Sequence, residues 1–440
     1  MSPAIPQARL LDPNSGISPR SRDLQSATPN LERRQPAIRS QAAARPQQIR
    51  LAIISTHPIQ YHGHWFRALA ARPELDLHVF YCYDPSPSDQ ARAGFGVEFE
   101  WDIPLLAGYR YTFLNRRFKQ PAELLAPSFP QILQALERDH YDAVLVNGWH
   151  YKAAWQTIFA CWKLGVPVMV RGDSQLASPR SAVKRLLKYP LYRSFIPRFD
   201  ACLAVGTRSH DYYMHYGADP QRVFVVPHAV QDDLFHPPAD DAQLPRKAVR
   251  RKWGLQDQQT VFLFAGKFIE PKRPLDFLRA MEAAARKEPA IAGLMVGDGP
   301  LRSGCEEFVN SRQLPVRFTG FLNQSRMVEA YAACDCLVLP SNWESWGLVV
   351  NEAMSCSRPA VVSDAVGCAP DLVHDGRTGA VFPAGNVDAL TEILIAFGGD
   401  PEGLRDMGQH ARAALRPYSL DAAVQGVLDA AEAVTKGVTK

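Results

Sequence analysis

The sequence predicts an α/β fold made of two doubly wound, Rossmann-like halves that face a cleft. Two series of short apolar runs alternate with helical segments, and such alternation indicates parallel sheets covered by helices on both faces. A linker at 229–258, polar and charged from residue 236, separates the two series. With 440 residues, 46% of them hydrophobic, the chain is long and apolar enough for two such halves.

The first half is predicted to span residues 49–228. Apolar runs predict strands at 49–55, 77–82, 141–146, 166–170, 201–205 and 223–226. Polar residues follow several of these strands, and ligands of such sheets bind outside the carboxyl ends of the strands. The sequence therefore places ligand contacts in the segments after these strands.

The second half is predicted to span residues 259–419, and a C-terminal helix at 420–440 follows it. Strands are expected at 261–265, 294–296, 316–319, 336–339, 360–363 and 378–382, and a helix is expected to begin at Pro274, a favourable first-turn residue.

The first 48 residues are rich in Pro, Ser, Gln, Ala and Arg, a composition that predicts a disordered N-terminal tail. The net charge of +4 points to no nucleic-acid partner, and we find neither a secretory h-region nor an uninterrupted apolar stretch of membrane-spanning length. The eight cysteines form no Cys-x-x-Cys pair and are expected to be reduced. These features favour a cytoplasmic protein.

Residues 335–356 combine a buried strand, a loop and the start of a helix. The first N–H groups of a helix lack internal partners and carry the positive end of its dipole, so Gly347, Leu348 and Val349 could form an anion cradle. Glu344 and Glu352 bracket it, and carboxylates accept hydrogen bonds from hydroxyl groups. This arrangement suits a nucleotide-sugar, although two solvated glutamates beside an ordinary turn fit the same pattern.

Lys267 and Lys272 follow the first strand of the second half, at the ligand-binding edge. Two ammonium groups there would stabilise the negative charge that develops on a departing diphosphate; a basic surface loop is the alternative. Gly266 precedes them, and Gly297 opens a glycine turn after the next strand. That turn lacks the Gly-x-Gly-x-x-Gly pattern, so a purely structural role stays open.

Three histidines, His57, His62 and His64, lie within eight residues and raise the question of a zinc site. Orienting carboxylates are missing from the pattern, so we predict no metal. Instead, the loop Tyr61-His62-Gly63-His64 is expected to reach the ligand from the first half. His150 ends another strand and is either a sugar ligand or a structural histidine.

The stretch from Arg180 to Arg198 contains six Arg or Lys residues and no acid, interleaved with leucines and aromatic residues. A basic amphipathic segment can lie on an anionic membrane surface. A partly buried helix with a solvated basic face is the alternative, so the sequence leaves peripheral contact with the inner face of the membrane open.

Taken together, these motifs resemble retaining, GT-B-fold glycosyltransferases of family 4 (glycosyl transferases group 1). The resemblance covers about residues 50–435. Its members, in order, are Val223–Val230, Gly266-Lys267 with Lys272, Val296–Leu301, Phe318–Phe321, and Glu344 with seven residues to Glu352.

The resemblance implies a UDP- or GDP-linked sugar donor held mainly by the second half. Glu352 would bind the ribose hydroxyls and Glu344 the donor sugar. Both lysines and the amides of Leu348 and Val349 would hold the diphosphate. The remaining implied contacts are Phe321 and Leu322 beside the base, and acceptor or inter-domain contacts that include Arg171 and Asp173. Such enzymes need no metal and no cofactor, and their last helix returns to the N-terminal half.

Some residues depart from the family pattern. The family often has arginine where Lys267 stands, which keeps the charge but loses the bidentate fork. His62-Gly63-His64 replaces the usual paired glycines after the first strand, and Asn147 and His150 compete for the position of a family histidine.

From these motifs we expect a retaining transfer of sugar to a hydroxyl of a glycan or lipid-linked acceptor, in polysaccharide or glycolipid biosynthesis. Another GT-B enzyme, such as a nucleotide-sugar epimerase, and a non-catalytic sugar-binding relative are the alternatives. Intact Glu344, Glu352, Lys267 and Lys272 argue against the non-catalytic one.

Overall fold

The computed structural model describes residues 48–436 apart from 116–127, 178–181 and 236–245. The chain divides into two units, Met1–Arg45 and Pro46–Lys440, and every described residue belongs to the second. The predicted disordered tail therefore lies, except for Gln48, outside the described residues, as does the middle of the predicted linker.

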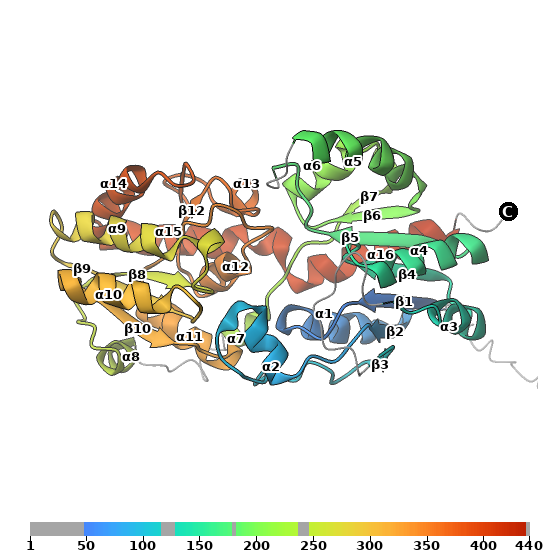
Figure 1. Cartoon of the computed structure of the whole chain (residues 1–440), viewed down its shortest axis with the longest axis horizontal. Coiled ribbons are helices and arrows are strands. Elements are labelled where there is room, and N and C mark those ends of the chain that lie inside the picture. The colour runs from blue at the N-terminus through green and yellow to red at the C-terminus, as the bar shows by residue number, and fades with distance from the viewer. Residues whose placement is uncertain (1–47, 116–127, 178–181, 236–245, 437–440) are drawn as a thin grey trace, which may run out of the picture. The chain divides into compact units, whose positions relative to one another are not determined.

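The N-terminal sheet has seven parallel strands in the order β3-β2-β1-β4-β5-β6-β7 (Figure 1). Neighbouring residues of β1 face opposite sides of the sheet, so Leu51 and Ile53 belong to one core cluster and Ala52 and Ile54 to another. The strands are β1 (Ile49–Ser55), β2 (Leu75–Tyr81), β3 (Arg110–Phe113), β4 (Ala143–Asn147), β5 (Val168–Gly172), β6 (Ala201–Ala204) and β7 (Val223–Val225).

The C-terminal sheet has six parallel strands in the order β10-β9-β8-β11-β12-β13. Every residue of β8, β9, β11 and β12 is buried, as expected for central parallel strands covered on both faces. The strands are β8 (Thr260–Ala265), β9 (Ile291–Val296), β10 (Val316–Gly320), β11 (Cys336–Leu339), β12 (Ala360–Ser363) and β13 (Gly379–Phe382).

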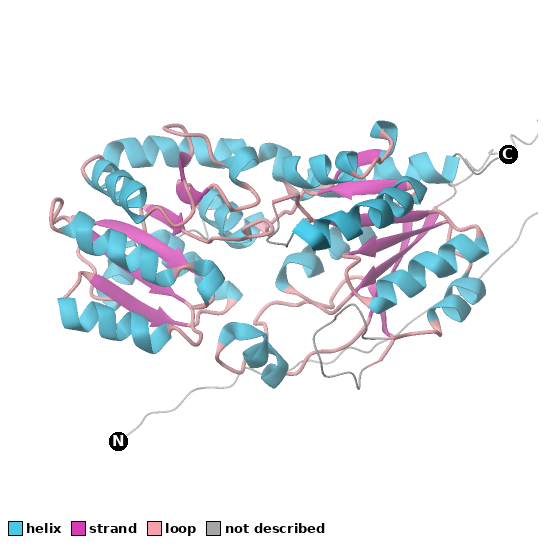
Figure 2. Cartoon of the chain, turned by 45° about the horizontal axis from the view of Figure 1, so that its top comes forward, coloured by secondary structure: helices cyan, strands magenta, loops and turns pink. Residues whose placement is uncertain are grey.

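Helices flank both faces of the two sheets (Figure 2), which confirms the doubly wound fold. In the first half they are α1 (Gln60–Ala70), α2 (Pro87–Gln90), η1 (Ala91–Phe95), α3 (Ile132–Asp139), α4 (Lys152–Leu164), α5 (Ala182–Phe195), η2 (Ile196–Arg198), α6 (Thr207–His215), η3 (Pro220–Arg222) and α7 (Asp232–Phe235). From the linker onward they are α8 (Arg246–Lys252), η4 (Glu270–Lys272), α9 (Pro274–Ala285), α10 (Arg302–Arg312), α11 (Gln324–Ala333), α12 (Leu348–Ser355), α13 (Ala369–Leu372), α14 (Val387–Gly398), α15 (Pro401–Ala414), η5 (Arg416–Tyr418) and α16 (Leu420–Lys436).

The C-terminal helix α16 packs on the N-terminal sheet rather than on the C-terminal one. Its apolar residues, among them Val424, Val427 and Leu428, belong to the core cluster that contains β1 and α1. Gly426 permits close packing, since a Cβ there would lie 2.2 Å from the carbonyl oxygen of Val225. The last described helix is therefore part of the N-terminal half, together with β1 and α1.

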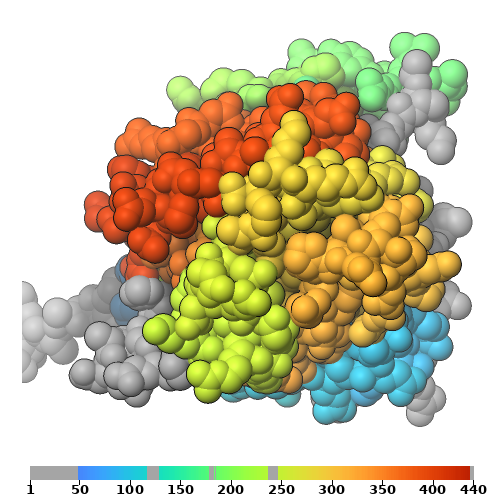
Figure 3. Space-filling view, turned by 90° about the vertical axis from the view of Figure 1, so that its left-hand side faces the viewer, coloured from blue at the N-terminus to red at the C-terminus, as the bar shows by residue number. Residues whose placement is uncertain are grey.

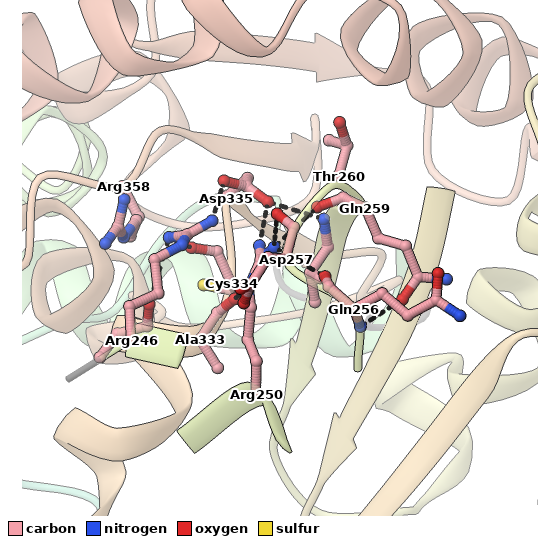
Figure 4. Close-up of polar contacts among 12 residues, drawn as sticks. Arg246, Arg250, Gln256, Asp257, Gln259, Thr260, Ala333, Cys334, Asp335 and Arg358 are labelled. Atoms are coloured by element: carbon pink, nitrogen blue, oxygen red, sulfur yellow. Dashed lines mark hydrogen bonds and ion pairs between the residues drawn. The ribbon is translucent and has the colours of Figure 1, made fainter. Parts of the chain in front are cut away.

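A buried arginine joins helix α8, in the predicted linker, to the C-terminal sheet (Figure 4). The Arg250 side chain is 1% exposed, and its Nη2 donates to the Asp335 carboxylate at 2.7 Å. Its other guanidinium nitrogens donate to main-chain oxygens of Ala333, Gln256, Asp257 and Gln259 at 2.8 to 3.1 Å. Arg246 of the same helix also pairs with Asp335, so two arginines of α8 hold this carboxylate, and Arg250 in addition connects α8 to the loop before β8.

All eight cysteines are free, and all but the partly buried Cys356 are buried. Along the part of the chain that the structure describes, no helix is long and apolar enough to cross a membrane.

Candidate active site

A cavity of about 570 Å³ lies where the carboxyl edges of the two sheets face each other. Strand order reverses next to β1 and β4 in one sheet and next to β8 and β11 in the other, and such switch points leave room for a ligand. The segments after these four strands contribute His62, Asn147, Lys267 and Glu344 to its wall. Every site residue predicted above lines the cavity except Gly63 and His64.

The prediction of a His62-Gly63-His64 loop is wrong. These residues lie in the first two turns of α1, where burial of His64, Trp65 and Phe66 holds the segment against the core. His64 is buried, with Nε2 3.2 Å from the carbonyl oxygen of Ala229, and a Cβ on Gly63 would lie 2.7 Å from the oxygen of Leu105. Only His62 of the three reaches the cavity.

Lys272 and Lys267 lie on the C-terminal side of the cavity. The ammonium group of Lys272 contacts Oε2 of Glu344 directly. Lys267 donates to the carbonyl oxygen of Ala93 at 2.6 Å, and its Nζ lies 4.2 Å from the ring centroid of Phe95. Burial lowers the pKa of both lysines, and with the added effect of the Lys267 charge it lowers the pKa of Lys272 to about 8.

Helix α12 presents its N-terminus to the cavity between the two glutamates. Gly347 is its N-cap with φ of 100°, a left-handed conformation that favours glycine, and Leu348 and Val349 begin the first turn. The strand-to-helix turn at Gly297 also requires glycine, since a Cβ there would lie 1.9 Å from the oxygen of Gly266. Backbone can therefore approach a ligand closely at both places.

Glu352 is 1% exposed and already bound by three hydroxyl or amide donors of the protein. Its Oε1 accepts from the Tyr61 hydroxyl and from Nε2 of Gln324, both at 2.9 Å, and its Oε2 accepts from the Tyr331 hydroxyl at 2.6 Å. Burial raises the pKa of Glu352, while these three bonds lower it. Tyr61 belongs to the first half and Glu352 to the second, so this hydrogen bond joins the two halves at the cavity.

A segment of the first half, residues 86–102, reaches the C-terminal half at Phe321. The Phe99 and Phe95 rings lie 4.3 and 5.9 Å from the Phe321 ring, centroid to centroid. Asn323 donates to the carbonyl oxygen of Glu100 at 2.6 Å, and Asp102 accepts from the amide of Ser325 at 3.1 Å. In Figure 3 this light-blue part of the chain lies against the orange residues of the C-terminal half.

Arg171 organises the floor of the cavity in the first half. It is buried, its guanidinium carbon lies 4.6 Å from the Trp65 ring centroid, and it donates to the carbonyl oxygens of Val226 and Pro227. Burial, followed by the Arg171 charge, lowers the pKa of His62 well below its usual value, so His62 is neutral.

Both Asn147 and His150 line the cavity. Asn147 is buried and accepts from Arg171 at 3.3 Å, whereas His150 is exposed. Asp173 lies 4.0 Å from Nε2 of His228.

Within the described residues, no group of three or more His, Cys, Asp or Glu side chains is placed to hold a metal ion.

Two family models match the chain. Residues 245–414 match the model described as glycosyl transferases group 1, and residues 64–234 match glycosyltransferase family 4. The chain belongs to the family 4 glycosyltransferases. The predicted GT-B fold and family are therefore confirmed.

Curated relatives are similar in sequence to part of this chain. A D-inositol 3-phosphate glycosyltransferase of Catenulispora acidiphila is 34% identical over 212 residues, 44% of this chain and 47% of the relative. One of Rhodococcus jostii is 28% identical over 305 residues, 67% of this chain and 62% of the relative. The matches thus span about half the length of the curated relatives.

The GT-B fold is shared with more distant proteins of known structure. Anabaena HepE, solved with UDP and glucose, superposes with a TM-score of 0.64 at 17% identity, covering 87% of this chain and 99% of HepE. Sucrose-phosphate synthase of Thermosynechococcus elongatus gives a TM-score of 0.63 at 19% identity, covering 87% and 98%.

For this family 4 chain, sequence reasoning missed several residues of the cavity wall. Phe95, Trp101, Gln324 and Trp346 line it but were not selected. The aromatic cluster Phe95, Phe99 and Trp101 between glycines was the available signal. This cluster was missed because a single sequence does not show which strand ends a long loop will approach.

Proposed function

We propose that this chain is a retaining glycosyltransferase that moves a sugar from a nucleoside-diphosphate sugar to a hydroxyl of a glycan or lipid-linked acceptor. One observation carries the proposal: two lysines, the N-terminus of α12 and two carboxylates converge on one cavity of about 570 Å³. That volume lies within the usual range for small-molecule sites. The donor type, the hexosyl group and a role in polysaccharide or glycolipid synthesis at the inner face of the membrane are parts of this proposal.

The proposed roles follow from charge and position. Lys272, Lys267 and the amides of Leu348 and Val349 stabilise the departing diphosphate, because cations and helix N-termini favour developing negative charge. Glu352 binds the ribose and Glu344 the donor sugar. Phe321 and Leu322 border the base, near Gly266 and Gly297 at the ends of β8 and β9.

Retention is proposed to proceed by attack on the face from which the diphosphate leaves. Glu344 is paired with Lys272, and Glu352 is held by three donors, so neither carboxylate is a free nucleophile in this arrangement. The leaving phosphate then takes the proton of the acceptor hydroxyl. Trapping a covalent glycosyl-enzyme on Glu344 would contradict this mechanism.

A thermal-shift screen with uridine, guanosine and adenosine diphosphates and their sugars tests the donor class. The matching nucleotide at a hundredfold excess over its dissociation constant should stabilise the protein by about 2.7 kcal/mol. Donor turnover that needs no acceptor would favour an epimerase instead. Tight nucleotide binding without turnover, with acceptors that include D-inositol 3-phosphate, would favour a non-catalytic relative.

We propose that transfer needs neither metal nor cofactor, since two lysines and a helix N-terminus can neutralise the diphosphate. Turnover is expected to persist after EDTA treatment and dialysis. Loss of activity that Mg²⁺ or Mn²⁺ restores would contradict this proposal.

Removing the Tyr61 hydroxyl should tighten nucleotide binding. A carboxylate offers about four lone-pair sites and Glu352 uses three, so two ribose hydroxyls can bind only if a protein donor leaves. In Tyr61→Phe that competition is gone, and nucleotide affinity should rise about 2- to 10-fold by calorimetry.

The control for this prediction is chemical. A 2′,3′-dideoxynucleoside diphosphate lacks both hydroxyls, so its affinity should be the same in Tyr61→Phe and the wild type. Equal gains for both ligands would show that Tyr61 does not compete for Glu352.

Nucleotide affinity should decrease as the pH rises through about 8. The pKa of Lys272 is lowered from its usual value to about 8, so the ammonium is charged below that pH and neutral above it. A bound diphosphate favours the charged form, and binding above pH 8 should therefore take up a proton. Calorimetry in buffers of different ionisation enthalpy measures this uptake; affinity independent of pH between 7 and 9.5 would contradict the role of Lys272.

A further inference from the structure

Helix α5 exposes its apolar face to solvent. Val183, Leu186, Leu187 and Leu191 are 67%, 75%, 70% and 52% exposed. Their spacing places them on one side of a helix, together with Pro190. We call these five residues the apolar face of α5. A surface helix ordinarily turns such a face toward the core.

The opposite side of α5 holds the helix on the protein by polar and aromatic contacts. Lys188 donates to the Tyr212 hydroxyl at 2.7 Å, and its Nζ lies 4.1 Å from the Tyr192 ring centroid. The Phe195 ring stacks on Trp162 with centroids 5.9 Å apart. These contacts hold α5 on the protein without using the apolar face of α5, which stays open to another partner.

Along the chain, α5 follows the strand whose end lines the proposed acceptor side of the cavity. The segment that precedes α5 begins at β5, whose end contributes Arg171 and Asp173 to the cavity wall. Leu176 in that segment is 42% exposed. Figure 1 shows α5 beside α6 on the outer side of the N-terminal half.

The charge around the apolar face of α5 indicates what covers it. Residues 180–198 contain six Arg or Lys and no Asp or Glu. Of these, Arg185, Arg193 and Arg198 are exposed, whereas Arg180 lies outside the described residues. An apolar stripe on a helix whose own charged residues are all basic complements an anionic lipid surface better than another copy of a chain that carries 45 acidic residues and 49 basic ones.

We propose that α5 docks this protein on an anionic bilayer, with Val183, Leu186, Leu187 and Leu191 inserted among the acyl chains. The helix lies in the plane of the interface, which suits a chain whose described helices are all too short or too polar to span a membrane. The inference rests on the proposed function in one respect: docking here brings the cavity to an acceptor that is itself held in the membrane.

Vesicle flotation tests the proposal with the full chain. Vesicles of phosphatidylcholine with about one third phosphatidylglycerol should carry the wild type, and pure phosphatidylcholine should carry much less. Leu186→Gln with Leu187→Gln should reduce the partition coefficient by at least about tenfold, since two inserted leucines are lost. The matched control, Leu186→Met with Leu187→Met, keeps apolar side chains and should bind like the wild type.

Two results would overturn the proposal. One is equal flotation of the glutamine and methionine variants. The other is a wild-type dimer that the glutamine variant converts to monomer in light scattering, without vesicle binding by either, which would assign the face to a second copy of the chain.

Nucleotide-induced thermal shifts in the same variants keep this test separate from the proposed function. The glutamine and wild-type proteins should give the same shift, since the apolar face of α5 does not line the cavity. Vesicle binding without any nucleotide shift would refute the donor site and leave the docking surface standing.

Discussion

Replacing Lys272 with alanine should reduce kcat by roughly a hundredfold to a thousandfold, the usual effect of losing one group that stabilises charge in the transition state. The reason is local. The Lys272 ammonium lies in the cavity at the end of η4, next to Glu344 and opposite the N-terminus of α12. A diphosphate that departs there gains negative charge, and the variant leaves only Lys267 and the helix dipole to balance it.

The fold should tolerate this change, because the Lys272 side chain is partly exposed and its removal leaves Glu344 at the wall of a cavity that water can enter. Lys287→Ala, at an exposed position beyond α9, is the matched control and should keep full activity. Kinetics at saturating donor and thermal denaturation measure both effects. Near-normal turnover in Lys272→Ala would rule out the diphosphate role.

The largest loss of stability is expected from Arg250→Ala, about 3–5 kcal/mol in the free energy of unfolding, as for other broken buried ion pairs. The substitution removes the buried partner of the Asp335 carboxylate, which keeps only the more exposed Arg246 as an ion-pair partner, and it removes the donor to four main-chain oxygens. Asp335 also accepts from the amide of Val261 at 2.8 Å, so the damage reaches the first residues of β8.

Urea denaturation followed by tryptophan fluorescence measures this loss. Arg251→Ala is the matched control: the same residue type, one position later in the same helix but exposed, and it should change stability by less than about 0.5 kcal/mol. Arg250→Lys should recover only part of the loss, because an ammonium group cannot reproduce the planar fork of five donors. Equal stability of the two alanine variants would show that the network in Figure 4 contributes nothing.

Two strands that are buried on both faces were predicted with their observed bounds, whereas β9, which is equally buried, begins at Ile291 rather than at residue 294. Cys336–Leu339 and Ala360–Ser363 have the predicted bounds, because a central parallel strand is a continuous apolar run with loops at both ends. The edge strand Arg110–Phe113 was missed, since its alternating polar residues carry little hydrophobic signal. Helix α15 was missed for a related reason, as only Leu404, Gly408 and Ala411 of its residues are buried.

The residues of the candidate site were predictable where they directly follow a buried strand. Lys267, Lys272, Glu344 and Gly347 follow β8 and β11, and the ends of parallel strands meet at one edge of a sheet, so their convergence follows from order along the chain. Gly63 and His64 were wrongly placed at the cavity. They lie in α1, which begins at Gln60, and a helix turns successive side chains to different faces, so only some residues of this segment can reach the ligand.

By itself, the sequence determined the class of fold, the two halves and the polar groups at each strand end, because these depend on local periodicity and on chain order. Only the tertiary structure decided which groups of one half meet the other. Tyr61 reaches Glu352 across 291 positions, and Ala93 reaches Lys267 across 174. Such pairs are set by how the two sheets pack against each other. The apolar face of α5 points outward for a similar reason, because the other side of that helix makes the contacts with the rest of the protein.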